Sequence, residues 1–510
     1  MLLLNLPDSL LAVVKDIGHW FHVNTNFKEK FFIANTNFYF WNAIFKKFLN
    51  EKMKFYLQDF FNNDRSINLD KIGKFQKRID VLNSRQEECF FSLFDGIKLR
   101  SCAYTITELL DFVESWNKGY KEIFDEIAAI ILSANVKAVF FNITSMFQMA
   151  FALGLILAIK KQAVAIKLIL ANYSYENFIV DTNKVHHIFD EICDFYNYKR
   201  IFNGMQSTCN KPDQKHLNQF ALSKYNVLSI KIFDMDCYWK KCTFCSQNEK
   251  KCSNTGYNVS TAIDKIHYYL SNFMIDTFVF TDESIPKDIL LDLSKRIIAF
   301  SLVISWNCRL RFDNVFSEEE LMIIKTAGCK GFLFGIETNS NNVLRQINKY
   351  DKDFDENAFL EICKTIKKSG IELQYSFIVG FPFERKEDLS GLKTFMLNLI
   401  NNGLHFSYFI NCFVLFPKAK IAEKMKNYLL SPNKTENDFN LPILTRYNNI
   451  HIMPWIKYMD KLLQKKLIRF RFRNSKKAYI VKFLFKSAYA LHFNYGIQSG
   501  IFKYKFRKSI

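Results

Sequence analysis

Three cysteines stand close together near the middle of the chain, at Cys237, Cys242 and Cys245, with the spacing C-x4-C-x2-C. Thiolates are soft ligands that favour iron–sulfur clusters, zinc or copper(I). A structural zinc site or a closed cluster normally takes four protein ligands, so three thiolates leave one position open for a substrate or cofactor. The triplet therefore predicts a catalytic metal centre, and the alternative is a zinc knuckle completed by Cys252.

The elements around this triplet repeat strand and helix. An apolar, β-branched run at 226–233 predicts a strand that ends just before the cysteines. Five more strands are expected at 275–282, 302–312, 330–336, 371–380 and 406–416, with helices between them at 261–271, 287–299, 318–327, 356–369 and 386–401. Repeated βα units close into a barrel whose chemistry lies at the carboxyl ends of the strands. We therefore predict an α/β fold in which residues 222–420 form a barrel domain.

The sequence Cys-Tyr-Trp-Lys-Lys-Cys-Thr-Phe-Cys-Ser at 237–246 resembles the cluster loop of the radical S-adenosylmethionine (SAM) family. Among the members of this family, its residues resemble most the cluster loops of the cobalamin-domain branch and of members that mature ribosomally made peptides (RiPPs). The usual family spacing, C-x3-C-x2-C, is one residue shorter. The resemblance implies an open, partial (β/α)6 TIM-type barrel and a [4Fe–4S] cluster on Cys237, Cys242 and Cys245, with SAM on the fourth iron. It also implies that Phe244 lies near the adenine of SAM.

The same resemblance implies an activity. In this family the reduced cluster cleaves SAM to methionine and a 5′-deoxyadenosyl radical, which takes hydrogen from an unactivated C–H bond. A low-potential electron donor of the flavodoxin or ferredoxin type is the expected partner. We expect a ribosomally made peptide as substrate. A cobalamin-dependent methyl or alkyl transferase is the alternative within this chemistry, and a zinc-stabilised basic protein that binds nucleic acid is the alternative of another class.

Further motifs at the predicted strand ends match the family in order. We expect Glu337 to hold the amino group or the ribose hydroxyls of SAM, with Asp282 and Glu283 as further candidates, because carboxylates make charge-assisted hydrogen bonds. Gly380 lets the backbone approach the adenosine closely. The motifs are Thr-Asp-Glu at 281–283, Cys-Arg-Leu-Arg at 308–311, Gly-Ile-Glu at 335–337 and Ile-Val-Gly-Phe-Pro at 378–382.

Two arginines on the third predicted strand are candidate anion ligands. Of Arg309 and Arg311, we expect one side chain to point into the barrel and the other to point out. The inward one could grip a carboxylate with both ends of its guanidinium. Taken singly, each of these acids and arginines also fits a structural ion pair. The sixth strand departs from the family, because Phe-Pro-Lys-Ala-Lys at 416–420 stands where Pro-Gly-Thr-Pro is common.

Residues 105–215 predict a smaller α/β domain before the barrel. A helix at 123–133, a strand at 136–143, a helix at 146–160 and a strand at 165–171 alternate as in a parallel sheet covered by helices. This resembles the Rossmann-like cobalamin-binding domain of the family. However, the motif Asp-x-His-x-x-Gly and a late Gly-Gly are absent from the sequence. We therefore expect a retained fold that has lost its cobalamin.

The two ends of the chain carry less information. Residues 1–104 are rich in aromatic side chains and are expected to be mostly helical and to build core. Residues 421–510 are expected to form a basic α+β extension, since 461–510 hold fourteen Lys and Arg and no Asp or Glu. Alternation of apolar and basic residues at 468–473 and 502–507 predicts strands with all cations on one face. That face could dock an acidic peptide or leader, or it could simply be solvated.

Composition favours a globular protein of a reducing compartment. Cysteines number twelve and are scattered apart from the triplet, which argues for free thiols in a cytoplasmic protein. The start of the chain lacks the basic region of a signal peptide, so none is expected. Residues 138–159 are uncharged and long enough to span a membrane. Polar residues interrupt them, so we predict a buried strand followed by an apolar helix instead.

Overall fold

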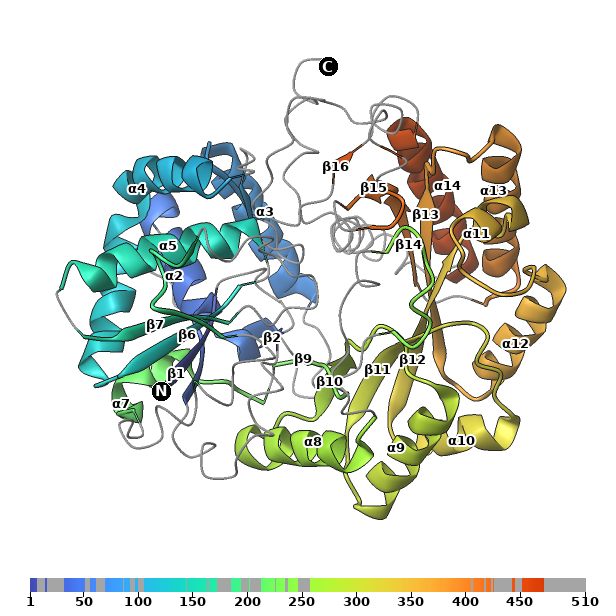
Figure 1. The fold of residues 1–510 in the computed structure, drawn as a ribbon, viewed down its shortest axis with the longest axis horizontal. Coiled ribbons are helices and arrows are strands. Elements are labelled where there is room, and N and C mark those ends of the chain that lie inside the picture. Colours follow the sequence, from blue (N-terminus) through green and yellow to red (C-terminus); the bar gives the residue numbers. More distant parts are fainter. Residues whose placement is uncertain are drawn as a thin grey trace. The chain divides into compact units, whose positions relative to one another are not determined.

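The computed structural model describes about two thirds of the chain's residues. They fall into two compact units, the first holding the described residues up to Asn226 and the second most of those from Val227 on. Figure 1 shows the elements of both units. The described residues are 1–6, 14–15, 32–50, 56–60, 69–85, 87–91, 97–99, 105–143, 145–162, 165–171, 185–193, 201, 212–224, 226–233, 237–245, 257–404, 407–416, 419–422, 425, 443–444 and 452–471.

The first unit is built on a parallel five-stranded sheet. Its strands lie in the order β3-β1-β6-β7-β8. Numbered along the chain this is 2-1-3-4-5, the flavodoxin-like order of doubly wound α/β folds. The point at which the strand order reverses therefore falls between β1 and β6. The strands are β1 (Leu2–Asn5), β3 (Phe32–Asn35), β6 (Ala138–Asn142), β7 (Lys167–Ala171) and β8 (Glu191–Cys193).

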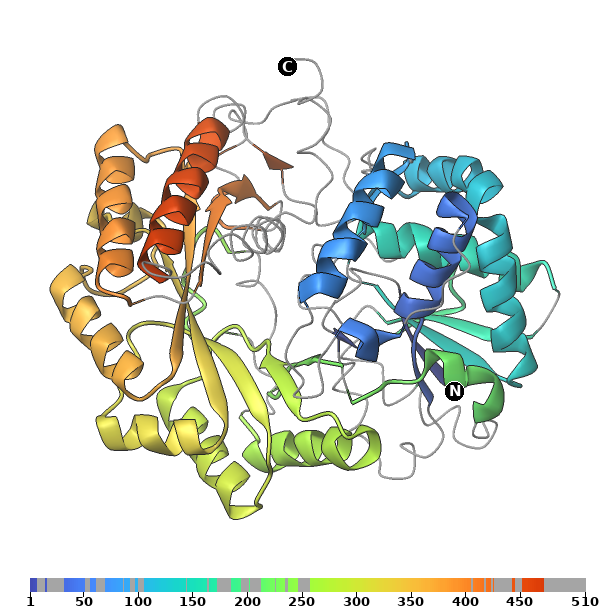
Figure 2. The same cartoon turned by 180° about the vertical axis from the view of Figure 1, so that it is seen from behind.

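Helices cover this sheet and share an aromatic core with it (Figure 2). The long helix α4 (Ile106–Ser133) begins at a capping box, in which Thr105 and Glu108 satisfy each other's backbone N–H groups. It packs on α5 (Met146–Lys160) at Gly154, where a Cβ would lie 2.5 Å from the Phe124 ring. The other elements of the unit are β2 (Val14–Lys15), α2 (Asn37–Leu49), η2 (Leu57–Phe60), α3 (Leu69–Arg85), β4 (Cys89–Phe91), β5 (Ile97–Leu99), α7 (Gln214–Leu217) and η4 (Asn218–Phe220).

Two features of this unit bear on the sequence predictions. The uncharged segment 138–159 forms the buried strand β6 and helix α5, as predicted. Among the described residues, no helix has the length and apolar character needed to cross a membrane. The first 104 residues are not only helical, because β1 and β3 pair with each other and β1 pairs with β6. Strands of four residues carry too little pattern to be told apart from other apolar runs.

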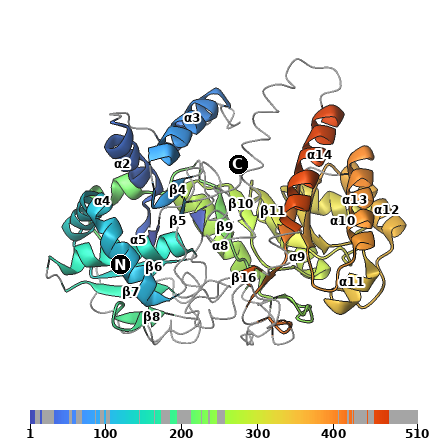
Figure 3. The same ribbon diagram turned by 90° about the horizontal axis from the view of Figure 1, so that it is seen from above.

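The second unit contains a curled parallel sheet with strands β9 to β14 in chain order. Helices follow the strands and line one side of the sheet (Figures 1 and 3). This half-barrel confirms the predicted partial (β/α)6 fold. Its strands are β9 (Leu228–Ile230), β10 (Thr277–Phe280), β11 (Ser305–Leu310), β12 (Cys329–Glu337), β13 (Glu372–Val379) and β14 (Ser407–Cys412), and its helices are α8 (Val259–Phe273), α9 (Lys287–Ala299), α10 (Glu318–Thr326), α11 (Asn341–Gln346), α12 (Glu356–Lys368) and α13 (Lys386–Asn401).

Alternate residues of the half-barrel strands face its two sides. In β11 and β13, every second residue is buried and those between are half-buried. The buried residues face the helices: the Tyr375 hydroxyl of β13, for example, donates to Cys363 of α12 at 3.3 Å. The half-buried residues, such as Asn307 of β11 and Gln374 of β13, therefore lie on the opposite, inner face of the half-barrel.

The C-terminal elements differ from the prediction. β15 (Val414–Leu415) and β16 (Ile443–Leu444) form an antiparallel pair, and α14 (Met453–Arg471) packs on α13 and β14. Residues 468–471 end this helix, so the strand predicted at 468–473 is wrong over these positions. The helix has already run for fifteen residues, 453–467, before this segment, and it packs on α13 and β14. Four alternating residues do not outweigh the extension of such a helix. Residues 472–510, with the second alternating segment, lie outside the described residues.

Candidate active site

The three cysteines lie on one loop that follows β9, at residues 237–245. Cys242 is buried, and Cys237 and Cys245 are half-buried. The backbone N–H of Cys245 donates to the carbonyl oxygen of Cys242 at 3.3 Å, which folds the second half of the loop into a turn. Burial raises the pKa of the Cys242 thiol, and the nearby Lys349 ammonium opposes that rise.

The thiols are brought to one place but are not arranged as metal ligands. Within the described part of the chain, no three His, Cys, Asp or Glu side chains are grouped so that they could hold a metal ion. The donor set nevertheless fits an iron–sulfur cluster, because three soft thiolates lie within nine residues. A cation beside Cys242 also favours the deprotonated form that binds metal. Cys252, the fourth ligand of the zinc alternative, lies outside the described residues.

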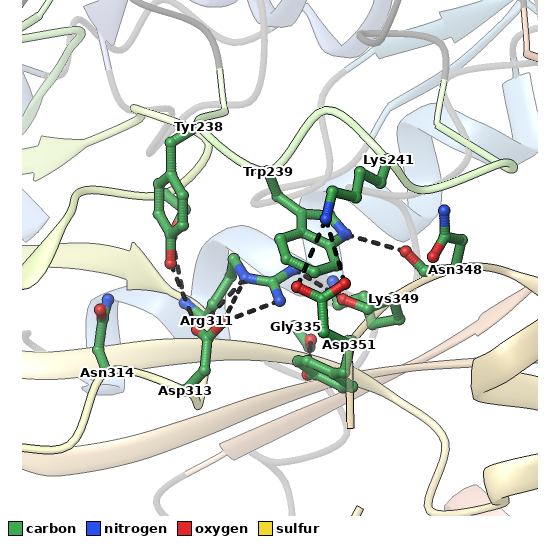
Figure 4. A network of polar contacts seen from close by, with 12 residues as sticks. Tyr238, Trp239, Lys241, Arg311, Asp313, Asn314, Gly335, Asn348, Lys349 and Asp351 are labelled. Atoms are coloured by element: carbon green, nitrogen blue, oxygen red, sulfur yellow. Dashed lines mark hydrogen bonds and ion pairs between the residues drawn. The ribbon is translucent and has the colours of Figure 1, made fainter. Parts of the chain in front are cut away.

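The cysteine loop is tied to the segment that follows helix α11, residues 346–351. Four contacts join them, all from loop residues between the cysteines, and Figure 4 shows those of Trp239 and Lys241. Backbone carbonyls of the 346–351 segment accept most of these hydrogen bonds, so the loop's path depends on main-chain positions. The contacts are Trp239 Nε1 to the Asn348 oxygen (2.9 Å), Thr243 N to the Ile347 oxygen (2.9 Å), Thr243 Oγ1 to the Gln346 oxygen (3.3 Å) and the Lys241–Asp351 ion pair (3.1 Å).

Arg311 joins the same loop to the barrel. Its side chain is only 4% exposed, and its Nη1 donates to the Lys349 carbonyl oxygen at 2.8 Å. Nε and Nη2 donate to the Asp313 carboxylate, the latter at 2.9 Å. The guanidinium also lies 4.0 Å from the centre of the Trp239 ring and 4.9 Å from that of Tyr350 (Figure 4). Each of the three guanidinium nitrogens of Arg311 therefore donates to a partner within the protein.

The sequence analysis expected Arg309 and Arg311 to point in opposite directions, but this expectation misapplied the alternation of side chains along a strand. Residues two apart on a strand share a face, since side chains alternate with period two. Arg309 lies on the inner face, where its Nη1 is 3.5 Å from the Glu283 carboxylate. Arg311 follows the end of β11 and is turned into the loop network. Only Arg309 is thus placed to meet a ligand on the inner face.

Asp282 holds the backbone that leads from β9 toward the cysteines. It is 1% exposed, and its two carboxylate oxygens accept from the backbone N–H groups of Ile232 (3.0 Å) and Phe233 (2.9 Å). Lys265, which is also buried, donates to the carbonyl oxygen of Lys231 beside it at 2.8 Å. Both oxygens of Asp282 are therefore engaged by the chain, which differs from the SAM contact expected for this residue.

Burial raises the pKa of Asp282 to about 6, although Lys231 and the two backbone N–H groups oppose the rise. A carboxyl whose pKa is higher in the folded state stabilises the fold when protonated, and this contribution is lost as the pH rises from about 4 to about 6. A rise in pKa of this size corresponds to about 3 kcal/mol in the free energy of unfolding. We expect the free energy of unfolding of the wild-type chain to fall by this amount relative to Asp282→Asn between pH 4 and pH 7.

Chemical unfolding at a series of pH values measures this difference. Asp292→Asn is the matched control, because Asp292 forms an exposed pair with Arg296 on α9. Its curve should run parallel to that of the wild-type chain. Parallel curves for Asp282→Asn as well would show that the Asp282 carboxyl is not held in its buried environment.

Glu337 is presented by an irregularity of β12. The pairing of β12 with β13 shifts between Gly335 and Glu337, and Glu337 has a φ of 66°, in the left-handed region. Bulges and such backbone strain are common where a side chain is redirected at a functional site. The Glu337 carboxylate meets the Lys349 ammonium at 2.8 Å, with both groups nearly buried. A Cβ on Gly335 would lie 2.8 Å from this carboxylate, so a side chain there would require the carboxylate to shift.

Lys349 connects the residues of the site and was missed by the sequence analysis. Burial alone would lower its pKa, but the Glu337 carboxylate raises it above the ordinary value. The ammonium also interacts with Cys242 and lies 6.0 Å from the centre of the Phe244 ring. A lysine in a polar run after a short helix gives no local signal of burial. Its proximity to Glu337 arises only because α11 turns the chain back toward the end of β12.

The end of β13 carries a second missed residue. Gly380 has a φ of 91°, in a region that favours glycine. Its backbone N–H donates a hydrogen bond to the Glu384 carboxylate. Burial raises the pKa of Glu384 to about 8, and its other carboxylate oxygen is buried with no hydrogen-bond partner among the described residues. Phe381 packs edge-on against Phe244 of the cysteine loop, with ring centres 5.8 Å apart. Gly380 is thus near the residue predicted to lie beside adenine.

Comparison with known proteins agrees with this geometry. Residues 237–396, which include the cysteine loop and most of the half-barrel, match the model of the radical SAM superfamily. This segment of the chain is therefore similar to radical SAM proteins. Over 161 residues, or 31% of its length, the chain is 30% identical to an uncharacterised methyltransferase, PH0819, of Pyrococcus horikoshii. The chain spans about a third of the length of that curated relative.

Solved structures share the fold. The cobalamin-dependent SAM radical enzyme OxsB, with aqua-cobalamin and SAM bound, superposes with a TM-score of 0.52 at 12% identity, covering 72% of this chain and 64% of that chain. OxsB with aqua-cobalamin alone gives a TM-score of 0.50 at 14% identity, covering 74% and 71%. The likeness extends over more of the chain than the half-barrel alone occupies. At this identity it shows the fold only.

Proposed function

We propose that this chain binds a [4Fe–4S] cluster through Cys237, Cys242 and Cys245 and cleaves SAM reductively to methionine and 5′-deoxyadenosine. The observation that carries the proposal is the loop of three thiols, held by the 346–351 segment at the carboxyl ends of a six-stranded half-barrel. When bound, the cluster supplies the electron for cleavage of the SAM sulfonium. A reductant of low potential must deliver that electron.

The protein's own residues would bind SAM and exclude water. The Glu337–Lys349 pair offers one negative and one positive group beside Cys242, which complements the amino and carboxylate groups of an amino acid. The Phe244 ring is held against Phe381 and offers an apolar face for adenine. The positive φ of Gly380 lets the main chain pass close to a ligand there.

Anaerobic reconstitution with iron and sulfide, followed by reduction in the presence of SAM, tests the proposal. We expect 5′-deoxyadenosine and methionine in equal amounts, measured by chromatography. Glu337→Gln should raise the KM for SAM by about tenfold or more, since a charge-assisted hydrogen bond is worth about 1.5–3 kcal/mol. A reconstituted chain with about four irons that leaves SAM intact under a strong reductant would exclude the activity.

A cobalamin-dependent methyl or alkyl transfer is the second candidate. The flavodoxin-like strand order of the first unit favours it, because such sheets bind ligands at the switch point, here between β1 and β6. The strands flanking that point, and β3 beside them, end in register on Asn5, Asn142 and Asn35. A polar strand edge suits a ligand rich in amides. Retention of hydroxocobalamin by the purified chain through gel filtration would support this candidate, and its loss would remove it.

The expected peptide substrate stays a prediction. It rests on the wording of the cysteine loop and on the basic residues near the C-terminus. Arg469 and Arg471 belong to α14, and 472–510 lie outside the described residues. The docking strand on which the acidic-peptide proposal depended is therefore not formed at 468–471.

A further inference from the structure

Two amide side chains on the inner face of the half-barrel have no hydrogen-bond partner in the described part of the chain. Asn307 belongs to β11 and Gln374 to β13. The Oδ1 atom of Asn307 is buried and unpaired. Burying a polar atom without a partner costs free energy, and natural proteins accept few such cases. Exceptions of this kind are expected at functional sites, where a ligand supplies the missing partner.

The two amides flank one glycine. Asn307 is the register partner of Gly331 on the neighbouring strand β12. From the other side, the Nε2 atom of Gln374 would lie 3.8 Å from a Cβ placed on Gly331. Strand β12 thus has no side chain at the position between the two amides. The arrangement leaves their polar ends on either side of a bare stretch of backbone.

The rest of the inner face shows that such residues can be satisfied internally. On β14, Asn411 Nδ2 donates to the Ser376 hydroxyl of β13 at 3.3 Å. Arg309 has Glu283 as an ion-pair partner. Asn307 and Gln374 differ from these neighbours, because neither side-chain amide makes a hydrogen bond within the described residues. Barrel interiors are usually filled by branched apolar side chains, so two unpaired amides there call for a ligand.

We propose that Asn307 and Gln374 bind a neutral amide group of the substrate, a carboxamide or a peptide bond, above Gly331. Each side-chain amide offers one N–H donor edge and one carbonyl acceptor, whichever way its oxygen and nitrogen are assigned. A substrate amide presents the complementary acceptor and donor. A carboxylate only accepts, so it would leave the carbonyl acceptor of each side-chain amide unpaired. This inference rests on the proposed function, since it takes the inner face as the place where a substrate lies.

Thermal unfolding of the anaerobically purified full chain gives the first test. Asn307→Leu and Gln374→Leu keep the side-chain size and remove the unpaired polar atoms. We expect Tm to stay the same or to rise by about 2–4 °C, the size of shift that a small gain in stability produces in a domain of this length. Asn411→Leu, which breaks the bond to Ser376, is the matched control and should lower Tm. A fall in Tm for both test variants would show that the amides are structural and would overturn the proposal.

Ligand binding gives the second test, and neither SAM nor reductant is needed for it. Saturation-transfer NMR with N-acetylglycinamide, a small molecule with two amides, should show contact with the wild-type chain. The affinity should fall about tenfold or more in the Asn307→Leu/Gln374→Leu double variant, the equivalent of one or two lost hydrogen bonds. Acetate and adenosine serve as carboxylate and purine probes. Equal binding of the amide to both proteins, or a dependence on these residues for acetate or adenosine instead, would overturn the proposal. Failure of SAM cleavage would leave these measurements unaffected.

Discussion

Cys242→Ala is expected to leave the chain without an iron–sulfur cluster. Cys242 is the buried member of the triplet, and Lys349 beside it favours the thiolate form that binds metal. Two thiolates and an alanine cannot hold a cluster that needs three protein ligands. After anaerobic reconstitution and gel filtration, we expect about four irons and four sulfides per wild-type chain and close to none in the variant. The visible absorbance bands of the cluster should likewise be present in the wild-type chain and missing from the variant.

A buried cysteine elsewhere in the barrel provides the control. Cys308 lies on the helix-facing side of β11, and burial raises the pKa of its thiol well above the ordinary value. Cys308→Ala removes the same chemical group at a small packing cost and should keep full iron content. Equal iron in Cys242→Ala and the wild-type chain would show that the triplet is not the cluster site. Zinc bound in place of iron would favour the knuckle alternative.

Arg311→Leu should have the next largest effect, because it removes the centre of the network that holds the cysteine loop. The change deletes the hydrogen bond to the Lys349 carbonyl, the bonds to Asp313 and the contacts with Trp239 and Tyr350. Breaking a buried ion pair costs about 3–5 kcal/mol. Asp313 is partly exposed and can be solvated after the change, so we expect a loss of roughly 2–4 kcal/mol in unfolding free energy.

The effect on the cluster separates this role from general stability. A loosened loop should lose iron several-fold faster on exposure to air, as followed by the decay of cluster absorbance at a temperature where the variant stays folded. Arg311→Lys should recover part of the stability but little of the cluster lifetime, since lysine lacks the planar fork that serves Lys349 and Asp313 at once. Arg345→Gln is the control, as Arg345 forms an exposed pair with Asp353. Wild-type cluster lifetime in Arg311→Leu would contradict the positioning role.

Local pattern was enough to predict much of the second unit. The helices α9, α13 and, in the first unit, α5 have the residues expected from the sequence, 287–299, 386–401 and 146–160. The barrel strands were found in the expected places. Except for β12, their ends were predicted too far out, as with 226–233 for Leu228–Ile230. Strand ends depend on where the neighbouring strand stops pairing, and a single sequence does not contain that information.

The sequence was enough to single out the three thiols of the candidate site, but it did not indicate which side chains contact one another there. The thiol triplet is a feature of nine consecutive residues and needs no fold to be seen. Glu337 lies at the end of β12 as expected, and its contact with SAM stays a prediction. No sequence pattern indicated its partner Lys349, because the chain must turn through α11 before the two meet. Asp282 and Arg311 carry the charges expected of ligand contacts, yet their partners belong to the loop and its supports.

By itself, the sequence of this protein determined the three sulfur donors, the order of βα units and the family that they resemble. These are properties of residue type and short-range spacing, and they persist however the elements pack. The tertiary structure alone decided which charged groups are free to meet a ligand and which hold the cysteine loop in place. Within the part of the chain that the structure describes, it also left the side-chain amides of Asn307 and Gln374 without a hydrogen-bond partner on either side of Gly331. Pairing of side chains depends on contacts between residues far apart in the chain, so it follows only once the strands are in register.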